Sequence, residues 1–395
     1  MPSKVALTAG AFDAAPIILP MSTPATPHAI LPPTDTAHMA QALDLARQAL
    51  FITSPNPRVG CVIVGTDGAV LGSGHTQRAG QAHAEVMALR DAQAKNNQVQ
   101  GATAYVTLEP CSHQGRTGPC CDALIQAGLA RVVVALPDPN PQVAGQGIAR
   151  LRAAGVHVDV GLLGDQAHDI NIGFFKRMTQ GTPWVRMKIA ASLDGQTALE
   201  NGVSQWITSA PARDDGHAWR ARACAVLTGI GTVLQDDPQL DVRAVPTPRQ
   251  PTLVVMDSQL ETPPTAQLFK PQRPVWIYCA VEHDERRAAL EAQGAEVICL
   301  PHPSGKVDLA AMLQDLGHKH INEVHVEAGH KLNGSLLREG LVDELLTYLA
   351  PKLMGQGRGM TNLGPFTHLS ETKALTFHEV TQIGPDLRIL ARLAR

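Results

Sequence analysis

The chain has 395 residues, 44% of them hydrophobic and 17% charged, and its 33 basic and 36 acidic residues leave a net charge of −3. This length exceeds one ordinary hydrophobic core, so we expect two domains. The near-balance of charge and the aromatic content of only 4% offer no broad basic or stacking surface. We therefore expect neither nucleic acid nor a membrane as a partner.

Cysteine usage and the first residues indicate the compartment. Seven cysteines are spread over the chain, an odd number that does not fit a secreted disulfide framework. No run reaches the roughly 18 uninterrupted apolar residues that a membrane span needs. Prolines interrupt the start of the chain throughout, which fits neither a signal peptide nor an Arg-rich transit peptide. We expect a flexible Pro-rich tail over residues 1–36 and a reducing, cytoplasmic location.

The first half of the chain alternates helical and strand patterns. In chain order we expect a helix over 35–53 with Asp35 or Thr36 as its N-cap, a strand ending at 64, a hairpin partner over 70–76, a helix over 82–96, a strand over 102–110, a helix over 119–128, a strand over 131–139, a helix over 145–155 and a strand over 157–163. Such alternation predicts a layered α/β domain.

A second, different series follows a natural joint. A helix over 165–183 closes in Gly-Thr-Pro, which marks a domain boundary near residue 182. After it we expect strands over 184–195, 251–258, 274–280, 295–301 and 322–329, with helices over 209–229, 284–294 and 333–350. No repeat links the halves. The pattern predicts two unlike α/β domains, over 37–182 and 183–395.

A cluster of cysteines in the first domain suggests a metal site. Cys111, Cys120 and Cys121 lie within eleven residues, and His83 opens the preceding helix. Catalytic zinc takes three ligands of the Cys and His type and keeps a fourth position for water. Helix N-termini at one sheet edge also favour thiolates. We predict zinc bound by His83, Cys111 and Cys120; Pro before Cys120 marks the first helical turn and directs Cys121 toward the core.

Glu85 lies two residues after the expected histidine ligand. A carboxylate beside zinc-bound water can take its proton and pass it to a leaving amine, so we predict Glu85 as the catalytic acid and base. The alternative is a structural zinc with four protein ligands, the fourth supplied by Cys121 or His113. Glu85 and the position of the cysteines after the strand in "TLEPC" favour the catalytic reading.

The pattern H-x-E followed by P-C and a second cysteine resembles that of zinc deaminases. "HAEVMAL" and "TLEPCSHQGRTGPC" resemble the deaminase half of the bifunctional riboflavin-biosynthesis proteins, which implies a cytidine-deaminase-like three-layer α/β/α fold. Nucleobase deaminases usually place two residues between the cysteines, whereas eight stand here. The resemblance implies that His113 and Arg116 in this insert contact a ribose phosphate. It also implies that Asn56 in "SPNPRVG" contacts the pyrimidine.

The second half resembles the reductase of the same family, which is dihydrofolate-reductase-like and binds NADPH without a G-x-G-x-x-G turn. The matching segments include "MKIAASLDGQTAL", "SQWITS", "TGIGTVLQDDPQLDVR" and "VHVEAGHKLNGSLL". The resemblance implies substrate contacts by Ser204, Arg220, Leu240, Arg243 and Glu327. It implies NADPH contacts by Ala190, Trp206, Thr232, Asp236, Gly329, Leu332, Asn333, Gly334 and Ser335. Asp236 and Glu327 are the acidic candidates for the proton donor.

The implied function is a pair of consecutive reactions. The first is zinc-dependent hydrolytic deamination of 2,5-diamino-6-ribosylamino-4(3H)-pyrimidinone 5′-phosphate, and the second is NADPH-dependent reduction of the ribosyl to the ribityl side chain. The resemblance also implies a homodimer or higher oligomer, for which the apolar segment 341–353 is a candidate surface. The alternatives are a zinc nucleobase or nucleoside deaminase with a non-catalytic second domain, and a zinc-stabilised binding module without catalysis.

Overall fold

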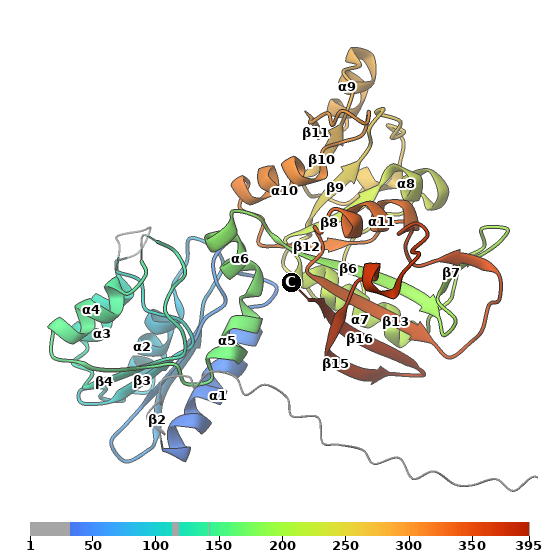
Figure 1. The fold of residues 1–395 in the computed structure, drawn as a ribbon. Helices are drawn as coiled ribbons and strands as arrows, with labels where there is room; N and C mark the ends of the chain where they lie inside the picture. Colours follow the sequence, from blue (N-terminus) through green and yellow to red (C-terminus); the bar gives the residue numbers. More distant parts are fainter. Residues whose placement is uncertain (1–31, 113–117, 142, 395) are drawn as a thin grey trace, which may run out of the picture.

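The computed structural model describes residues 32–394 except 113–117 and 142, and they form two α/β modules that lie side by side (Figure 1). The expected tail falls mostly on residues 1–31, outside the described residues. Its last residues differ from the expectation because helix α1 (Pro33–Gln48) begins before the proposed boundary at 36. Asp35 does not cap this helix. It is buried and accepts hydrogen bonds from Tyr105 Oη (2.6 Å) and Arg131 Nη2 (2.7 Å).

The first module is built on a five-stranded sheet in the order β2-β1-β3-β4-β5. Its strands are β1 (Gly60–Val64), β2 (Val70–His75), β3 (Thr103–Val106), β4 (Arg131–Val134) and β5 (His157–Val160). Strand β1 is antiparallel to both β2 and β3, whereas β3, β4 and β5 are parallel. The expected strands are therefore all present, and the β1–β2 hairpin forms one edge of the sheet.

Helices cover both faces of this sheet. Alternate residues of β1 enter two cores: Cys61 and Ile63 pack beneath one helical layer, and Val62 and Val64 pack beneath the other. The first layer contains α2 (Ala84–Ala94), α3 (Cys120–Gln126) and α4 (Gln146–Ala153), and the second contains α1 and α5 (Gly164–Ile170). Successive side chains of a strand point to opposite faces of the sheet, so a strand that is buried on both faces contributes to two cores. The expected three-layer α/β/α fold is confirmed.

The joint between the modules is two helices and not one. α5 ends at Ile170 and α6 (Ile172–Gln180) follows, with Asn171 between them at φ −112° and ψ 17°. The Asn171 side chain accepts from the backbone N–H of Arg58 (2.7 Å) and donates to its carbonyl (2.8 Å). These bonds to a distant segment accompany the break in the helix that we expected over 165–183.

The second module contains a nine-stranded sheet in the order β11-β10-β9-β8-β12-β6-β13-β16-β15. Its strands are β6 (Trp184–Ser192), β8 (Ala225–Gly229), β9 (Thr252–Met256), β10 (Val275–Cys279), β11 (Ala295–Cys299), β12 (Glu323–Val326), β13 (Glu344–Ala350), β15 (Leu375–Ile383) and β16 (Asp386–Leu393). The strands from β11 to β13 are parallel, and β16 and β15 add to them antiparallel. A small antiparallel pair joins β7 (Gln196–Leu199) to β14 (Gly357–Gly359).

Two segments that we expected to be single helices each form a helix followed by a central strand of the sheet. The helix expected over 209–229 ends as α7 (Ala210–Arg222), and β8 follows it. The helix expected over 333–350 is α11 (His330–Arg338) followed by β13. A short apolar run that is buried inside a sheet has no periodicity to separate it from a buried helix. Because β13 lies between β6 and β16, this part of segment 341–353 has no free strand edge, and its role as an oligomer surface stays a prediction.

Helices also cover both faces of the second sheet. α10 (Leu309–His318) and α11 pack on one core, and α8 (Ile230–Asp236) and α9 (Asp284–Glu291) pack on another, while α7 covers β13 and β16. Single 3₁₀ turns span Gln267–Phe269 and Leu369–Glu371. The expected dihydrofolate-reductase-like α/β fold of the second domain is confirmed. Among the described residues, no helix has the length and apolar character of a membrane span.

Candidate functional site

Three segments of the first module meet at one edge of its sheet. Thr107, directly after β3, exchanges hydrogen bonds of 3.1 Å with Gly60 at the start of β1. Thr76, directly after β2, donates its backbone N–H to the Val59 carbonyl (2.9 Å). The segments 51–59, 76–83 and 107–111 therefore lie together where the parallel strands β3 and β4 end. Ligands of open α/β sheets bind at this carboxyl edge.

The predicted metal ligands come together at this edge. His83 is the N-cap of α2, Cys120 is the first residue of α3, and Cys111 follows β3. The His83 Nδ1 atom lies 3.6 Å from Cys111 Sγ and 3.4 Å from Cys120 Sγ. Tetrahedral zinc, with bonds of about 2.0–2.3 Å, separates its ligand atoms by roughly 3.5–3.8 Å. The donor set and its spacing fit zinc, and among the described residues this group includes no fourth ligand.

Contacts among these side chains favour ionised sulfur. A hydrogen bond from Cys120, helped by His83, lowers the pKa of Cys111 to about 4. The same bond raises the pKa of Cys120, because Cys120 then supplies the proton. The contact with Cys111 raises the pKa of His83. A divalent cation among these atoms replaces the protons and stabilises both thiolates.

Glu85 lies in the first turn of α2, and its side chain is buried beside the triad. Burial, reinforced by the charge of Cys111, raises the pKa of Glu85 to about 7. A carboxyl group whose pKa is near the working pH can both accept and donate a proton. Glu85 therefore has the position and the acidity that a proton carrier at this edge requires.

Cys121 is not part of the group. It is buried in the core beneath α2, α3 and α4, and burial raises the pKa of its thiol to about 11. Sequence reasoning missed Glu109, which holds the cysteine segment in place. Its carboxylate accepts backbone hydrogen bonds from Asp138, Gly145, Gly147 and Ile148, at 2.9–3.2 Å. These bonds tie the end of β3 to the start of α4.

The substrate-binding residues expected in the first module are only partly described. Asn56 is half-buried in segment 51–59, at the edge that holds the triad. In the described part of the chain, no hydrogen bond uses its side chain, which leaves the amide available to a ligand. His113 and Arg116 lie outside the described residues.

The second module contains a cavity of about 1380 Å³ at the carboxyl ends of β6, β8, β9 and β12. The size exceeds the roughly 300–1,000 Å³ typical of pockets for drug-sized ligands, which suits a dinucleotide together with a second molecule. Most residues expected at this site line it: Ala190, Ser204, Trp206, Arg220, Thr232, Asp236, Leu240, Arg243, Glu327, Gly329, Leu332, Asn333 and Ser335.

Gly334 is the exception among the expected cofactor residues, because it does not line this cavity. A Cβ atom at Gly334 would lie 2.0 Å from the carbonyl oxygen of Asn362. The glycine thus permits close packing of α11 on the segment that follows β14 and does not line the cavity.

A charged group occupies one side of the cavity. Arg220 Nε donates to Glu327 Oε1 (2.7 Å), and Lys188 Nζ lies 3.7 Å from Glu327 Oε2. Burial opposes ionisation of Glu327, but Arg220 and Lys188 outweigh it and hold its pKa well below the usual range. Glu327 is therefore a poor proton donor, contrary to one of our two candidates. Burial raises the pKa of Asp236, the other candidate.

Lys188 was missed by sequence reasoning, although it lines the cavity beside Glu327. The only signal in the sequence is a lysine inside a largely apolar strand, within "MKIAA". A charged side chain in such a strand is unusual unless it faces a ligand or a partner. Here it faces both.

The nucleotide side of the cavity has unpaired polar groups. α11 begins at the cavity after Gly329, so the N–H groups of its first turn are available to a phosphate. The Asn333 Oδ1 atom is buried on the cavity side of this helix and has no hydrogen-bond partner among the described residues. An unpaired buried oxygen is costly unless a ligand satisfies it. These features fit NADPH.

Comparisons with known proteins agree with the two modules. Residues 32–136 match the family model of the cytidine and deoxycytidylate deaminase zinc-binding region, and residues 183–389 match that of the RibD C-terminal domain. The riboflavin biosynthesis protein RibD of Escherichia coli is 46% identical over 366 residues, which cover 89% of this chain and 98% of that protein. The Aquifex aeolicus protein of the same name is 41% identical over 90% of this chain and 97% of its own length.

Solved structures show the same relationship over both modules. Acinetobacter baumannii RibD superposes with a TM-score of 0.83 at 42% identity, over 92% of this chain and 99% of the other. A Thermotoga maritima structure, titled a diaminohydroxyphosphoribosylaminopyrimidine deaminase/5-amino-6-(5-phosphoribosylamino)uracil reductase, gives 0.80 at 30% identity over 91% and 99%. With both modules matched in one chain and in the same order, the chain belongs to the RibD family of bifunctional riboflavin-biosynthesis enzymes, which combine a zinc-dependent deaminase with an NADPH-dependent reductase.

Proposed function

We propose that this chain deaminates 2,5-diamino-6-ribosylamino-4(3H)-pyrimidinone 5′-phosphate in its first domain, over residues 37–182, and reduces the ribosyl group of the product in its second, over 183–395. The observation that carries the proposal is the His83, Cys111 and Cys120 triad with the buried Glu85 beside it. The reactions in the printed title of the Thermotoga maritima relative support the substrate.

In the deamination step, His83, Cys111 and Cys120 would hold zinc, and the bound metal would make water nucleophilic toward the amino-bearing ring carbon. Glu85 takes a proton from this water and gives it to the leaving ammonia. Asn56 hydrogen-bonds the pyrimidine edge, and His113 and Arg116 bind the ribose phosphate. The ring carbon loses an amino group and gains an oxygen, so a pyrimidinedione leaves the site.

In the reduction step, the cavity would hold NADPH, whose chemistry would provide the hydride for C1′ of the opened ribosylamine. The ring oxygen that is released on opening needs a proton, and Lys188 is the charged donor best placed to give it. Glu327 accepts hydrogen bonds and keeps Lys188 and Arg220 in position. Arg220 and Arg243 bind the phosphate, together with Ser204 and the backbone at Leu240. The NADPH site is formed by Ala190, Trp206, Thr232, Asp236, Gly329, Leu332, Asn333 and Ser335, with Gly334 contributing through its packing.

A charged and largely buried group in the cavity is not what a non-catalytic domain requires. A second domain that only stabilised the first would gain more from apolar residues of the same volume. The rival function, a zinc deaminase with an inactive second domain, is therefore less well supported. NADPH oxidation by the purified chain in the presence of the deaminated substrate separates the two functions.

We also propose a homodimer and a cytoplasmic location. β15 is the edge strand of the nine-stranded sheet, and it exposes Leu375, Phe377 and Val380. An open strand edge with apolar side chains can pair with a second copy of the chain. Thiolate ligands and NADPH both suit a reducing compartment. Light scattering of the purified chain and of a Phe377→Glu variant tests the dimer, which the variant should weaken.

Two experiments test the enzymatic proposal. Incubation with the diaminopyrimidine substrate alone should exchange one amino group for oxygen, as read by mass spectrometry. The Glu85→Gln variant should bind zinc but leave the substrate unchanged. Deamination by this variant at the wild-type rate would contradict the assigned role of Glu85.

A further inference from the structure

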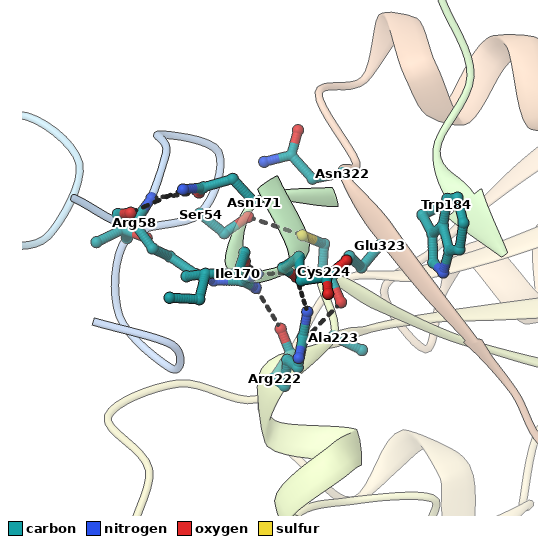
Figure 2. A network of polar contacts seen from close by, with 12 residues as sticks. Ser54, Arg58, Ile170, Asn171, Trp184, Arg222, Ala223, Cys224, Asn322 and Glu323 are labelled. Atoms are coloured by element: carbon teal, nitrogen blue, oxygen red, sulfur yellow. Dashed lines mark hydrogen bonds and ion pairs between the residues drawn. The ribbon is translucent and has the colours of Figure 1, made fainter. Parts of the chain in front are cut away.

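The segment that carries Asn56 is held by side chains and backbone of the second module (Figure 2). Its contacts run along residues 51–58: Arg249 Nε donates to the Phe51 carbonyl (3.1 Å), Ser54 Oγ donates to Cys224 Sγ (3.1 Å), and Asn322 Nδ2 donates to the Pro55 carbonyl (2.9 Å). None of these groups of the second module belongs to the reductase cavity. Their common effect is to fix the backbone on both sides of the residue that we assign to the pyrimidine.

Arg58 makes the most extensive of these contacts. Its side chain is almost fully buried, and its guanidinium pairs with Glu323, the first residue of β12. The same guanidinium donates to the carbonyls of Ile170 (2.8 Å) and Arg222 (3.0 Å). The backbone of Arg58 is held by Asn171, as described above. Across the residues that the structure describes, all the hydrogen bonds that Arg58 donates therefore lead to the joint between α5 and α6 or to the second module.

Glu323 does not depend on Arg58 for its charge partner. Arg186 Nη1 and Arg222 Nε each lie 2.9 Å from Glu323 Oε2. Burial opposes ionisation of Glu323, but the three arginines hold its pKa well below the usual range. Removal of Arg58 thus leaves a buried carboxylate that is still paired twice, which avoids the large cost of an unpaired buried charge. Substitution of Arg58 therefore removes the anchor of segment 51–59 and leaves Glu323 paired.

The anchor and the reductase site lie at opposite ends of one strand. Glu323 begins β12, and Glu327 follows it at the cavity. Four residues of extended strand span roughly 13 Å. A change at Arg58 therefore acts on the deaminase side, and the charged group around Glu327 remains in place.

We propose that Arg58 is a positioning residue for deamination: by pairing with Glu323 it holds segment 51–59 so that Asn56 stands at the pyrimidine site. The second module then completes the deaminase pocket although it supplies no zinc ligand. This inference rests on the proposed contact between Asn56 and the substrate. The specificity of the first domain would accordingly depend on docking of the second.

The test compares two full-length variants. Arg58→Met removes the anchor, and Lys176→Met is the matched control, because Lys176 Nζ pairs with Asp343 Oδ2 (2.6 Å) across the modules but lies on α6, outside the segment. Deamination is measured without NADPH, together with zinc content and with NADPH-dependent reduction of the deaminated compound. For Arg58→Met we expect the KM of deamination to rise about tenfold, as for one lost substrate hydrogen bond.

In the expected result, the kcat, zinc content and reduction of Arg58→Met stay close to wild type, and Lys176→Met changes none of these quantities. Arg58→Lys should recover part of the KM, since its ammonium can reach Glu323. This variant also carries the test if Arg58→Met fails to fold. An unchanged KM in both Arg58 variants, or an equal rise in Lys176→Met, overturns the proposal.

A double-mutant cycle shows whether Arg58 acts through Asn56. If it does, Asn56→Ala and the Asn56→Ala/Arg58→Met double variant should have nearly the same KM, because coupled residues are not additive. Additive effects overturn the inference while the proposed function stands. A wild-type chain that does not deaminate the substrate rejects the proposed function itself.

Discussion

The two sites of this molecule differ in how the chain builds them. The triad and Glu85 come from two short segments, 83–85 and 111–120, which two helix N-termini and one strand end bring together. The reductase cavity is lined by residues from Lys188 to Met360, drawn from many loops at the carboxyl ends of parallel strands. A local site leaves a spacing pattern in the sequence, whereas a dispersed site leaves single residues whose meaning depends on the fold.

The difference also separates the two chemistries. We expect the first site to work through a metal and one buried carboxyl group, and the second through NADPH, with Lys188 as proton donor and Arg220 on the substrate phosphate. Variants at one site should therefore leave the other reaction intact.

Among the variants that leave the metal in place, Glu85→Gln should have the largest effect. Loss of a positioned acid and base costs about 10²–10⁴-fold in rate, and we expect deamination to fall within that range. Zinc content should stay at the wild-type level because Glu85 is not a ligand. Reduction of the deaminated compound by NADPH should also be unchanged. A parallel loss of reduction would mean that the two sites are not separate.

Lys188→Met should have the opposite pattern, with slower reduction and unchanged deamination. Removal of a charged donor at the reacting centre typically costs about 10²–10³-fold, so NADPH oxidation with the deaminated compound should fall by that amount. Deamination measured without NADPH should match wild type. If both rates fall together, the lysine supports the fold and does not serve the reduction.

Cys120→Ser and Cys121→Ser distinguish the neighbouring thiols. Loss of the Cys120 sulfur leaves zinc with two protein ligands, so most of the metal should be absent after dialysis and deamination should disappear with it. Cys121→Ser should keep its zinc and lose about 1–3 kcal/mol of unfolding free energy, because it places a hydroxyl in an apolar core. Metal analysis and denaturant titration measure both. Loss of zinc from the Cys121→Ser variant would identify Cys121, and not Cys120, as the metal ligand.

Asn333→Ala should have the smallest effect. If NADPH satisfies the buried Asn333 oxygen, one hydrogen bond of about 1 kcal/mol is lost and the KM for NADPH rises about fivefold. Deamination should not respond. An NADPH titration of the reduction rate gives the answer, and an unchanged KM would place the cofactor elsewhere in the cavity.

Sequence reasoning gave most of the first domain, since its strands and helices alternate with clear periods and its ligands follow the spacing of a motif. It could not show that Asn171 would break the helix over 165–183, because the hydrogen bonds responsible reach back to Arg58. Nor could it find Glu109, whose role depends on the backbone of α4 more than 30 residues later. Contacts between distant segments leave no local pattern.

In the second domain, the sequence pattern predicts helix at β8 and β13, because central parallel strands are apolar throughout and lack the alternation of a half-buried strand. The resemblance placed most cavity residues, but it could not show that Glu327 is held ionised by Arg220 and Lys188. The ion pairs of Glu327 disfavour it as the acid, and Lys188 lines the cavity beside it. Side-chain partners, more than the order of elements, were what the sequence alone lacked.

The most direct test of two separate chemistries in one chain is a pair of incubations of the purified protein with the diaminopyrimidine ribose phosphate, read by mass spectrometry. Without NADPH, the product should have one amino group replaced by oxygen and nothing more. With NADPH, the same product should gain two further hydrogens. A gain of hydrogens without loss of the amino group, or no deamination until NADPH is added, would contradict this account.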